Sequence, residues 1–349
     1  MNPYNYSKIW ITKIIESRFP FRFNNAFLTS LFKLGITPNL IFFIFYLFRH
    51  EYITKQFLIS YIFVLIWVTL GPYMIWYYDE KLLPNFFFRA SDIVPSPKKL
   101  KLLAEKYDKL FSQKFWVITL PWIILLLIIW QYSLPTLSAK AGIFGIRDVW
   151  YWIGLVGIFW ISLLTSIGFW GVLTTLLAIK EISNEQLNID PLHPDKFGGL
   201  SCVGYYAIGT TILFSTGSLF LPAAFQLVAE NEILIPYVYL AVFLFSIFIL
   251  FSFLLPTVVI HQKAKFVRDD ILDKLRKDYH TLSQKIKNKH QNLTNEDILT
   301  YLHLSYLREE YFAYKNVKLY PFEIEIFAKL ISSVVLPFLF LLIQNYWLK

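Results

Sequence analysis

One short segment of the chain gathers the residue types that acid–base or metal chemistry requires. Asp190, His193 and Asp195 lie close together in the sequence, Glu185 precedes them, and Gly198-Gly199 follows. A histidine flanked by carboxylates can hold a divalent cation or exchange a proton with a substrate. Paired glycines at the start of a helix can instead offer backbone amides to an anion. The sequence therefore identifies a candidate ligand or regulatory loop: Asp190, His193, Asp195, Gly198 and Gly199.

The same residues also have a purely structural interpretation, which the sequence favours. Pro191 and Pro194 fix φ and extend the residue before each of them. Asp195 can cap the following helix or turn, His193 can bond a backbone carbonyl, and the glycines allow close packing. A single histidine lacks the ligand spacing that marks a zinc site. Only the residue types suggest a metal site, and its candidate ligands are Glu185, Asp190, His193 and Asp195. The sequence identifies no catalytic residue and no cofactor.

The stretch Pro191-Leu192-His193-Pro194-Asp195, followed by Gly198-Gly199-Leu200, resembles a loop in a set of uncharacterised bacterial multi-pass membrane proteins. The resemblance is confined to this stretch. It implies a bacterial membrane family, and it implies no activity.

Long apolar segments must position this loop. The 349-residue chain is 56% hydrophobic and 16% charged, and most of its charges lie between the apolar segments. A transmembrane helix needs about 20 mostly apolar residues. Six segments meet this requirement: Gln56–Tyr77, Lys114–Leu134, Val149–Ile179, Leu200–Val228, Leu234–Ile260 and Leu330–Trp347. A seventh, Gly35–Phe48, is shorter. The sequence therefore predicts an all-α, polytopic transmembrane helical bundle with a cytosolic helical hairpin.

The distribution of Lys and Arg bears on whether Gly35–Phe48 spans the membrane. Cytosolic loops of membrane proteins are enriched in these residues, and the enrichment is strongest when Gly35–Phe48 is counted as a span. We therefore favour seven spans, with six as the alternative, in the cytoplasmic (inner) membrane of a bacterium. The N-terminus is then cytosolic and the C-terminus external.

An apolar stripe also marks the N-terminal segment. Trp10, Ile11, Ile14 and Ile15 recur at helical spacing, and we expect them to lie in the lipid headgroup plane.

The sequence predicts four parts of the chain. Residues 1–34 form an N-terminal cytosolic segment, and residues 35–261 form a membrane part with one amphipathic cytosolic helix at 96–112. Residues 262–325 form the cytosolic hairpin, and residues 326–349 form the last span.

The hairpin is predicted from two apolar stripes. Val267, Ile271 and Leu275 begin a seam that continues at helical spacing to Ile286. A second helix begins near Thr294, and we expect its stripe to face the first: Ile298, Tyr301, Leu302, Ser305 and Tyr306. The hairpin either covers the inner ends of the spans or binds another copy or a cytosolic protein through 262–325.

One span combines small and hydroxylated residues on a single stripe: Gly204, Thr211, Ser215, Ser218 and Pro222. Such residues let helices approach closely and hydrogen-bond across their interface, which is the interpretation that the sequence favours. In the alternative interpretation the stripe lines a narrow hydrated path, and the five residues are pore-lining candidates.

Charge excludes several classes of function. The spans carry no Asp, Glu, Lys, Arg or His near their centres, which argues against proton-coupled transport and voltage sensing. They also lack the paired histidines that hold a membrane haem. The net charge of +9 favours attraction to a membrane surface over nucleic-acid binding, because no compact basic domain is evident.

Three functions fit these constraints. The first is an oligomeric channel or pore gated through its cytosolic helices. The second is a membrane scaffold or sensor that recruits a partner through the hairpin. The third is a membrane-embedded hydrolase or transferase that uses His193 and Asp195. The sequence ranks them in this order, and the expected partners are the lipid bilayer, further copies of the chain or a cytosolic protein.

Overall fold

A computed structural model describes residues 7–228, 235–287, 295–320 and 328–332, together with Val335, Leu339 and Leu342. Within these residues all regular structure is helical. Six described helices are long and apolar enough to cross a membrane: Ala26–Arg49, Lys55–Asp92, Pro97–Tyr132, Val149–Asn184, Ser201–Val228 and Ile235–Lys285. The predicted all-α polytopic bundle is confirmed.

The short predicted span at Gly35–Phe48 is part of a longer helix. It consists of α2 (Ala26–Ser30), a π-helical turn η1 (Leu31–Gly35) and α3 (Ile36–Arg49). These segments form a continuous stretch of 24 residues, which is sufficient to cross a bilayer. The predicted last span, Leu330–Trp347, lies largely outside the described residues.

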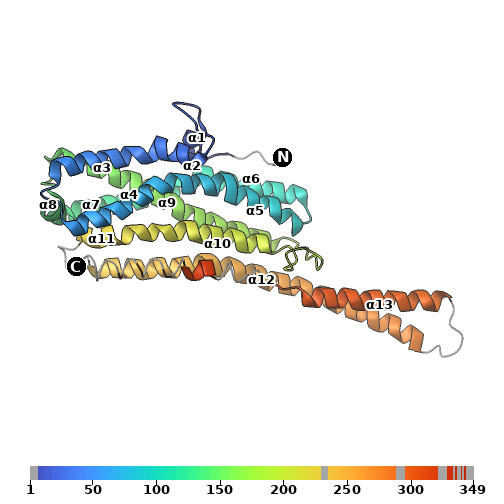
Figure 1. The fold of residues 1–349 in the computed structure, drawn as a ribbon. Coiled ribbons are helices and arrows are strands. Elements are labelled where there is room, and N and C mark those ends of the chain that lie inside the picture. Colours follow the sequence, from blue (N-terminus) through green and yellow to red (C-terminus); the bar gives the residue numbers. More distant parts are fainter. Residues whose placement is uncertain are drawn as a thin grey trace.

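The spanning helices lie side by side along a common direction (Figure 1). The central helix is α9, which packs against α4, α6, α7, α10 and α12. The elements of the bundle are α1 (Trp10–Glu16), α4 (Lys55–Tyr77), η2 (Tyr78–Leu82), α5 (Leu83–Arg89), η3 (Ala90–Asp92), α6 (Pro97–Lys114), α7 (Trp116–Tyr132), α8 (Leu134–Ala141), α9 (Val149–Asn184), α10 (Ser201–Ser215), η4 (Thr216–Phe220) and α11 (Leu221–Val228).

Hydroxyl groups join the spans in the interior of the bundle. The phenol of Tyr78 donates to the Gly171 carbonyl or the Thr175 hydroxyl, both at 3.0 Å, and lies 2.8 Å from the Tyr206 hydroxyl. Three elements, η2, α9 and α10, therefore meet at one buried phenol. Because hydrocarbon offers no water to a polar group, such contacts must be made within the protein.

The N-terminal helix packs into the protein core, which corrects one prediction. Ile11 and Ile15 of α1 are buried in the main hydrophobic cluster together with Ile9, and Ile14 is exposed. The expected placement of this whole stripe among lipid headgroups is therefore wrong. Helical spacing shows that a helix has an apolar face, but it does not distinguish a lipid from a protein partner.

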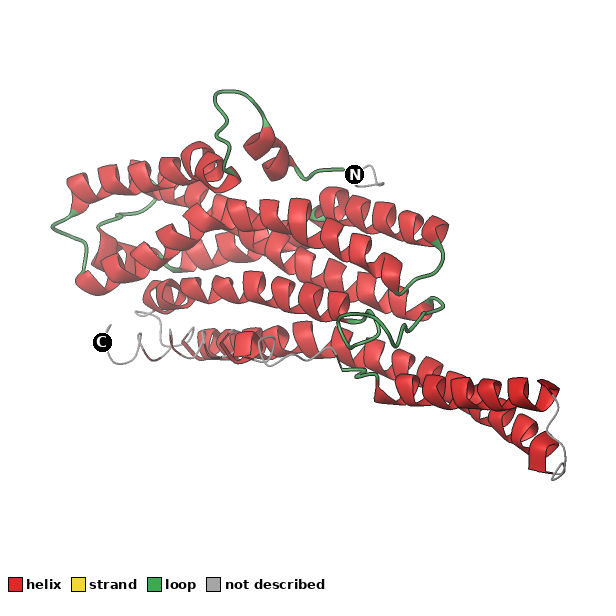
Figure 2. Ribbon diagram, turned by 45° about the vertical axis from the view of Figure 1, so that its right-hand side comes forward, coloured by secondary structure: helices red, strands yellow, loops and turns green. Residues whose placement is uncertain are grey.

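The hairpin projects far beyond one end of the bundle. The helix α12 (Ile235–Lys287) has 53 residues and is therefore about 80 Å long, against a hydrocarbon core of about 30 Å. Helix α13 (Asn295–Asn316) returns along its outer half (Figure 2). We call the end of the bundle from which the two helices project the hairpin end.

The two hairpin helices meet through a different face of α13 from the predicted one. Leu304, Leu307 and Asp297 are buried on α13, and Leu275 is buried on α12. The predicted stripe is exposed: Ile298, Tyr301, Leu302, Ser305 and Tyr306. This helix carries apolar residues on two opposite sides, so periodicity alone could not tell which side faces α12.

The burial of α1 can be tested with a matched pair of substitutions. We expect Ile11→Ala, at a side chain with 0% exposure, to destabilise the protein by about 2 kcal/mol or more through the cavity it leaves. Ile14→Ala, at 37% exposure, should have a much smaller effect. Thermal unfolding in detergent measures both, and equal effects would place α1 outside the core.

Candidate functional site

The candidate loop connects α9 to α10 at the hairpin end (Figure 1). Main-chain hydrogen bonds attach it to two distant segments of the chain. The amide of Asn188 donates to the Ile93 carbonyl at 2.8 Å, and the amide of Lys318 donates to the Lys196 carbonyl at 3.3 Å. Three segments therefore meet here: the end of the η3 turn, the loop itself and the chain that leaves α13.

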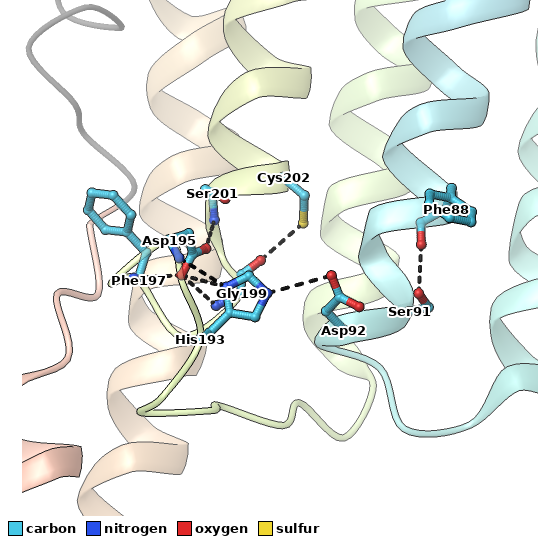
Figure 3. Close-up of polar contacts among 9 residues, drawn as sticks. All are labelled: Phe88, Ser91, Asp92, His193, Asp195, Phe197, Gly199, Ser201 and Cys202. Carbon is cyan, nitrogen blue, oxygen red and sulfur yellow. Dashed lines mark hydrogen bonds and ion pairs between the residues drawn. The ribbon is translucent and has the colours of Figure 1, made fainter.

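The carboxylate of Asp195 organises the loop (Figure 3). Its Oδ1 accepts hydrogen bonds from the amides of Phe197 at 2.8 Å and Gly199 at 3.1 Å. Its Oδ2 accepts from the amide of Ser201 at 3.2 Å, and Ser201 is the first residue of α10. The carboxylate thus satisfies amides at a helix N-terminus, where a negative charge is favoured.

These hydrogen bonds hold Asp195 in its charged form. Partial burial acts to raise the pKa of the Asp195 carboxyl, but the bonds from Gly199, Phe197, Ser201 and His193 outweigh it. The pKa of Asp195 therefore lies below its ordinary value. The predicted capping role of this residue agrees with the structure.

The two glycines are required by conformation and by space. Gly198 and Gly199 have φ angles of +66° and +90°, in the left-handed region. A Cβ atom at Gly198 would lie 2.6 Å from Cγ2 of Ile189, and one at Gly199 would lie 2.8 Å from Cγ2 of Ile93. Because the Gly199 amide bonds Asp195, the anion that this loop binds is its own carboxylate.

His193 lies between two carboxylates (Figure 3). Its Nδ1 is 2.8 Å from Oδ1 of Asp195, and its Nε2 is 3.6 Å from Oδ2 of Asp92. Nδ1 also lies 3.3 Å from the Asp195 amide, but we assign it a proton because the carboxylate contact is shorter. His193 thus has two carboxylate partners where the sequence suggested a backbone carbonyl, and its Nε2 is directed toward Asp92.

An open polar depression of about 340 Å³ adjoins His193. Its lining comes from the loop, from η3 and from α13: Asp92, Asn188, Ile189, Asp190, Pro191, His193 and Tyr314. Two carboxylates, an imidazole and a phenol favour a cationic or hydrogen-bonding group. The sequence did not identify Asp92 or Tyr314, because no local motif marks them and only the fold brings them to the loop.

The four residues considered as metal ligands do not converge. Glu185 forms an ion pair with Lys99 at 2.8 Å, and Asp190 accepts a hydrogen bond from the Leu192 amide at 2.9 Å. Among the described residues, no group of three His, Cys, Asp or Glu side chains is placed to hold a metal ion. His193 and Asp195 form a pair, to which the structure adds Asp92.

The five pore-lining candidates are buried within the single chain, and Thr211 contacts a neighbouring helix. Thr211 donates to the Ala207 carbonyl at 2.8 Å and lies 2.8 Å from the Ser252 hydroxyl of α12. Ser218 donates to the Ser215 carbonyl at 2.7 Å. Thr211 and Ser218 have 0% exposure, so no water-sized space reaches them in a single chain. Gly204, Ser215 and Pro222 are also buried.

Two further carboxylates, those of Asp79 and Asp108, are buried. Asp79 accepts a hydrogen bond from the Ile9 amide at 3.1 Å. Asp108 accepts from the amide of Ser7 at 2.5 Å and from its hydroxyl at 2.6 Å. They attach the N-terminal segment to η2 and α6. A signal existed for Asp108, because it follows Ala104 by one helical turn on the apolar face.

Comparisons of the chain with family models, with curated proteins and with solved structures find no match. The fold and the site define a polytopic helical membrane protein with a projecting hairpin. Its geometry is the basis of the functional argument that follows.

The capping role of Asp195 predicts a pH-dependent stability. We expect Asp195→Asn to lower stability at pH 7 by about 1–2 kcal/mol, the range for loss of a helix cap. Since the pKa of Asp195 is lowered by folding, its stabilisation is present above the unfolded value of about 3.9. It is lost as the pH falls through the folded value.

Thermal unfolding of the two proteins between pH 7 and pH 3 checks this prediction, with Asp190→Asn as the control at an exposed site. The difference between wild type and Asp195→Asn should shrink below about pH 4. A difference that stays constant over this range would contradict the charged cap.

Proposed function

We propose that the protein is a membrane-anchored scaffold that self-associates through the outward side of α13. The observation that carries the proposal is a set of large apolar side chains on that side. Their exposures are 51% for Ile298, 65% for Leu299, 63% for Leu302 and 60% for Tyr306. We call these four residues the outer stripe.

The outer stripe has the spacing of a helix-pairing surface. Ile298, Leu302 and Tyr306 follow each other at four-residue intervals, and Leu299 lies beside them. The stripe is opposite the side that packs on α12 through Leu304. Helix α13 therefore has two apolar sides. One side is covered by α12, and no described residue covers the other. An exposed apolar surface of this kind is typical of a protein interface.

A second copy of the chain is the occupant that geometry and charge favour. Copies inserted in the same orientation carry their α13 helices parallel, so a two-fold axis pairs Leu302 with Leu302. In heptad spacing Asn295 precedes Leu302 and Glu309 follows it. Two Glu309 carboxylates at one position would repel each other. Pairing is therefore confined to the half of α13 that is farther from the bundle.

The membrane makes a small interface sufficient. One helix face is smaller than the roughly 800 Å² per partner of a standard interface. Tethering two copies in one bilayer raises the effective concentration of their hairpins, which lets a modest contact hold them together. The scaffold then presents paired hairpins, and the loop with His193 lies at their base.

Cysteine cross-linking tests the pairing. In a Cys202→Ala background, which removes the single native cysteine, we expect Leu302→Cys to form a disulfide between copies in native membranes. The two-fold axis brings its Cβ atoms close to the separation of about 4 Å that a disulfide requires. Non-reducing gel electrophoresis measures the dimer.

The matched control is Lys277→Cys, at an exposed position on α12, which should cross-link far less. A second control combines Leu302→Cys with Ile298→Glu, which should prevent the cross-link by placing two like charges beside it. Equal cross-linking at 302 and 277, or none at 302, would refute the proposed interface.

An oligomeric channel gated through the hairpin is the second candidate. One observation supports it: α12 is a single helix, with Pro256 inside it, that extends from the hairpin to Ser252, whose hydroxyl contacts Thr211 of α10. A displacement of the hairpin would therefore act directly on the stripe of small and hydroxylated residues in α10.

Ion flux in liposomes separates the two candidates. Because Thr211 is buried and hydrogen-bonded, we expect wild-type protein to give no flux above protein-free liposomes. The control is the folded double variant Thr211→Leu with Ser215→Leu. Flux in the wild type that this variant abolishes would favour a channel along α10 over a scaffold alone.

A further inference from the structure

Three exposed phenylalanines lie in the segment that connects α1 to α2, residues 17–25, which we call the N-terminal loop. The loop projects sideways from the bundle, across the direction of the spans (Figure 1, Figure 2). Phe19 is 85% exposed, and Phe21 and Phe23 are 38% and 40% exposed. A gathered set of exposed apolar side chains is typical of a surface that contacts a protein or a membrane.

The aromatic side chains of the loop form a cluster with the first span. The ring centroids of Phe21 and Phe23 are 5.5 Å apart, and the ring of Phe32 in η1 lies 6.2 Å from the first and 5.1 Å from the second. The Phe23 amide donates a hydrogen bond to the Thr29 hydroxyl at 3.1 Å. These contacts hold the loop against α2 and η1, so its apolar surface has a defined position.

The first span places the loop at a membrane boundary. The uncharged part of the helix Ala26–Arg49 lies between Lys33 and Arg49, and a lysine near the end of a span directs its ammonium toward the headgroups. The Nζ of Lys33 donates to the carbonyls of Ile14 at 2.9 Å and Ser17 at 2.6 Å. The start of the loop therefore lies at the depth of Lys33.

The second span gives the same depth. The uncharged part of this span, which begins in α4, ends at Asp79 of η2. The Asp79 carboxylate accepts a hydrogen bond from the amide of Ile9, which immediately precedes α1. Helix α1 and the loop that follows it thus lie beside the boundaries of two spans, where apolar side chains reach acyl chains and basic side chains reach headgroups.

The charge of this region is positive and has no acidic neighbour in the sequence. Arg18 and Arg22 are exposed, and the chain contains no Asp or Glu between Glu16 and Glu51. Among the described residues, no carboxylate forms an ion pair with either arginine. Exposed basic residues beside a bilayer are attracted to anionic lipids, and a guanidinium matches the geometry of a phosphate.

We propose that the N-terminal loop is a contact site for anionic phospholipids. Its phenylalanines enter the outer part of the acyl-chain region, and Arg18 and Arg22 bind headgroup phosphates. A second copy of the chain is a poorer partner, because a two-fold axis would set the same positive charges against each other. The site is separate from the outer stripe, since α13 lies beyond the hairpin end (Figure 1), and it does not depend on the scaffold function.

Quenching of a fluorophore on the loop by labelled lipids tests the proposal. In a Cys202→Ala background, Phe19→Cys is labelled with bimane, and the full-length protein is placed in nanodiscs at one copy per disc. The discs contain phosphatidylglycerol and phosphatidylcholine, and either the first or the second carries a doxyl quencher near the start of its acyl chain.

We expect both labelled lipids to quench bimane, because Phe19 is inserted. Labelled phosphatidylglycerol should be about fivefold more effective at low mole fraction, which corresponds to about 1 kcal/mol of attraction to a basic residue. No quenching by either lipid, or equal quenching by both, would overturn the proposal.

Two double variants with the same loss of charge locate the effect. Arg18→Gln with Arg22→Gln should make the two lipids equally effective. Arg276→Gln with Lys277→Gln, at exposed positions on α12, should leave the difference unchanged. A difference that persists in the first variant would also overturn the proposal, and the lipid comparison with both arginines present decides if that variant does not fold.

Discussion

A bilayer supplies no water to a buried polar group, and the arrangement of this bundle depends on that constraint. The hydroxyls of the spans bond to carbonyls and to each other, as Thr211 does with Ser252 and Tyr78 does with Tyr206. These contacts fix which helix faces meet, since apolar side chains alone would pack equally well against lipid. Among the residues that suggest a hydrated path in the sequence, Thr211 joins α10 to α12 through this contact.

The hairpin end is organised by hydrogen bonds to a charged group, the carboxylate of Asp195. The carboxylate of Asp195 closes the loop onto the start of α10, and the loop is bonded to the chain beyond α13 through Lys196 and Lys318. Tyr314 of the hairpin and His193 of the loop line one depression. The base of the hairpin and the loop are therefore one unit, so a partner that moves α13 would also move the surroundings of His193.

The sequence predicted the class of fold because the length and composition of apolar segments determine what can span a bilayer. It also supported the structural role of Asp195 and the glycines, since turn chemistry is local. It could not provide the Asp92 partner of His193, the burial of Ile11 or the side of α13 that faces α12. Each of these depends on which distant segment packs there, and Ile11 would have the same helical spacing in lipid or in a core.

The central claim is that two hairpins pair through the outer stripe of α13. Its most direct test is the distance between spin labels attached at His303, an exposed position beside the stripe, in a Cys202→Ala protein reconstituted in bilayers. The account predicts a defined short distance between copies that Leu302→Glu removes. A broad distribution expected for randomly placed copies, unchanged by Leu302→Glu, would contradict it.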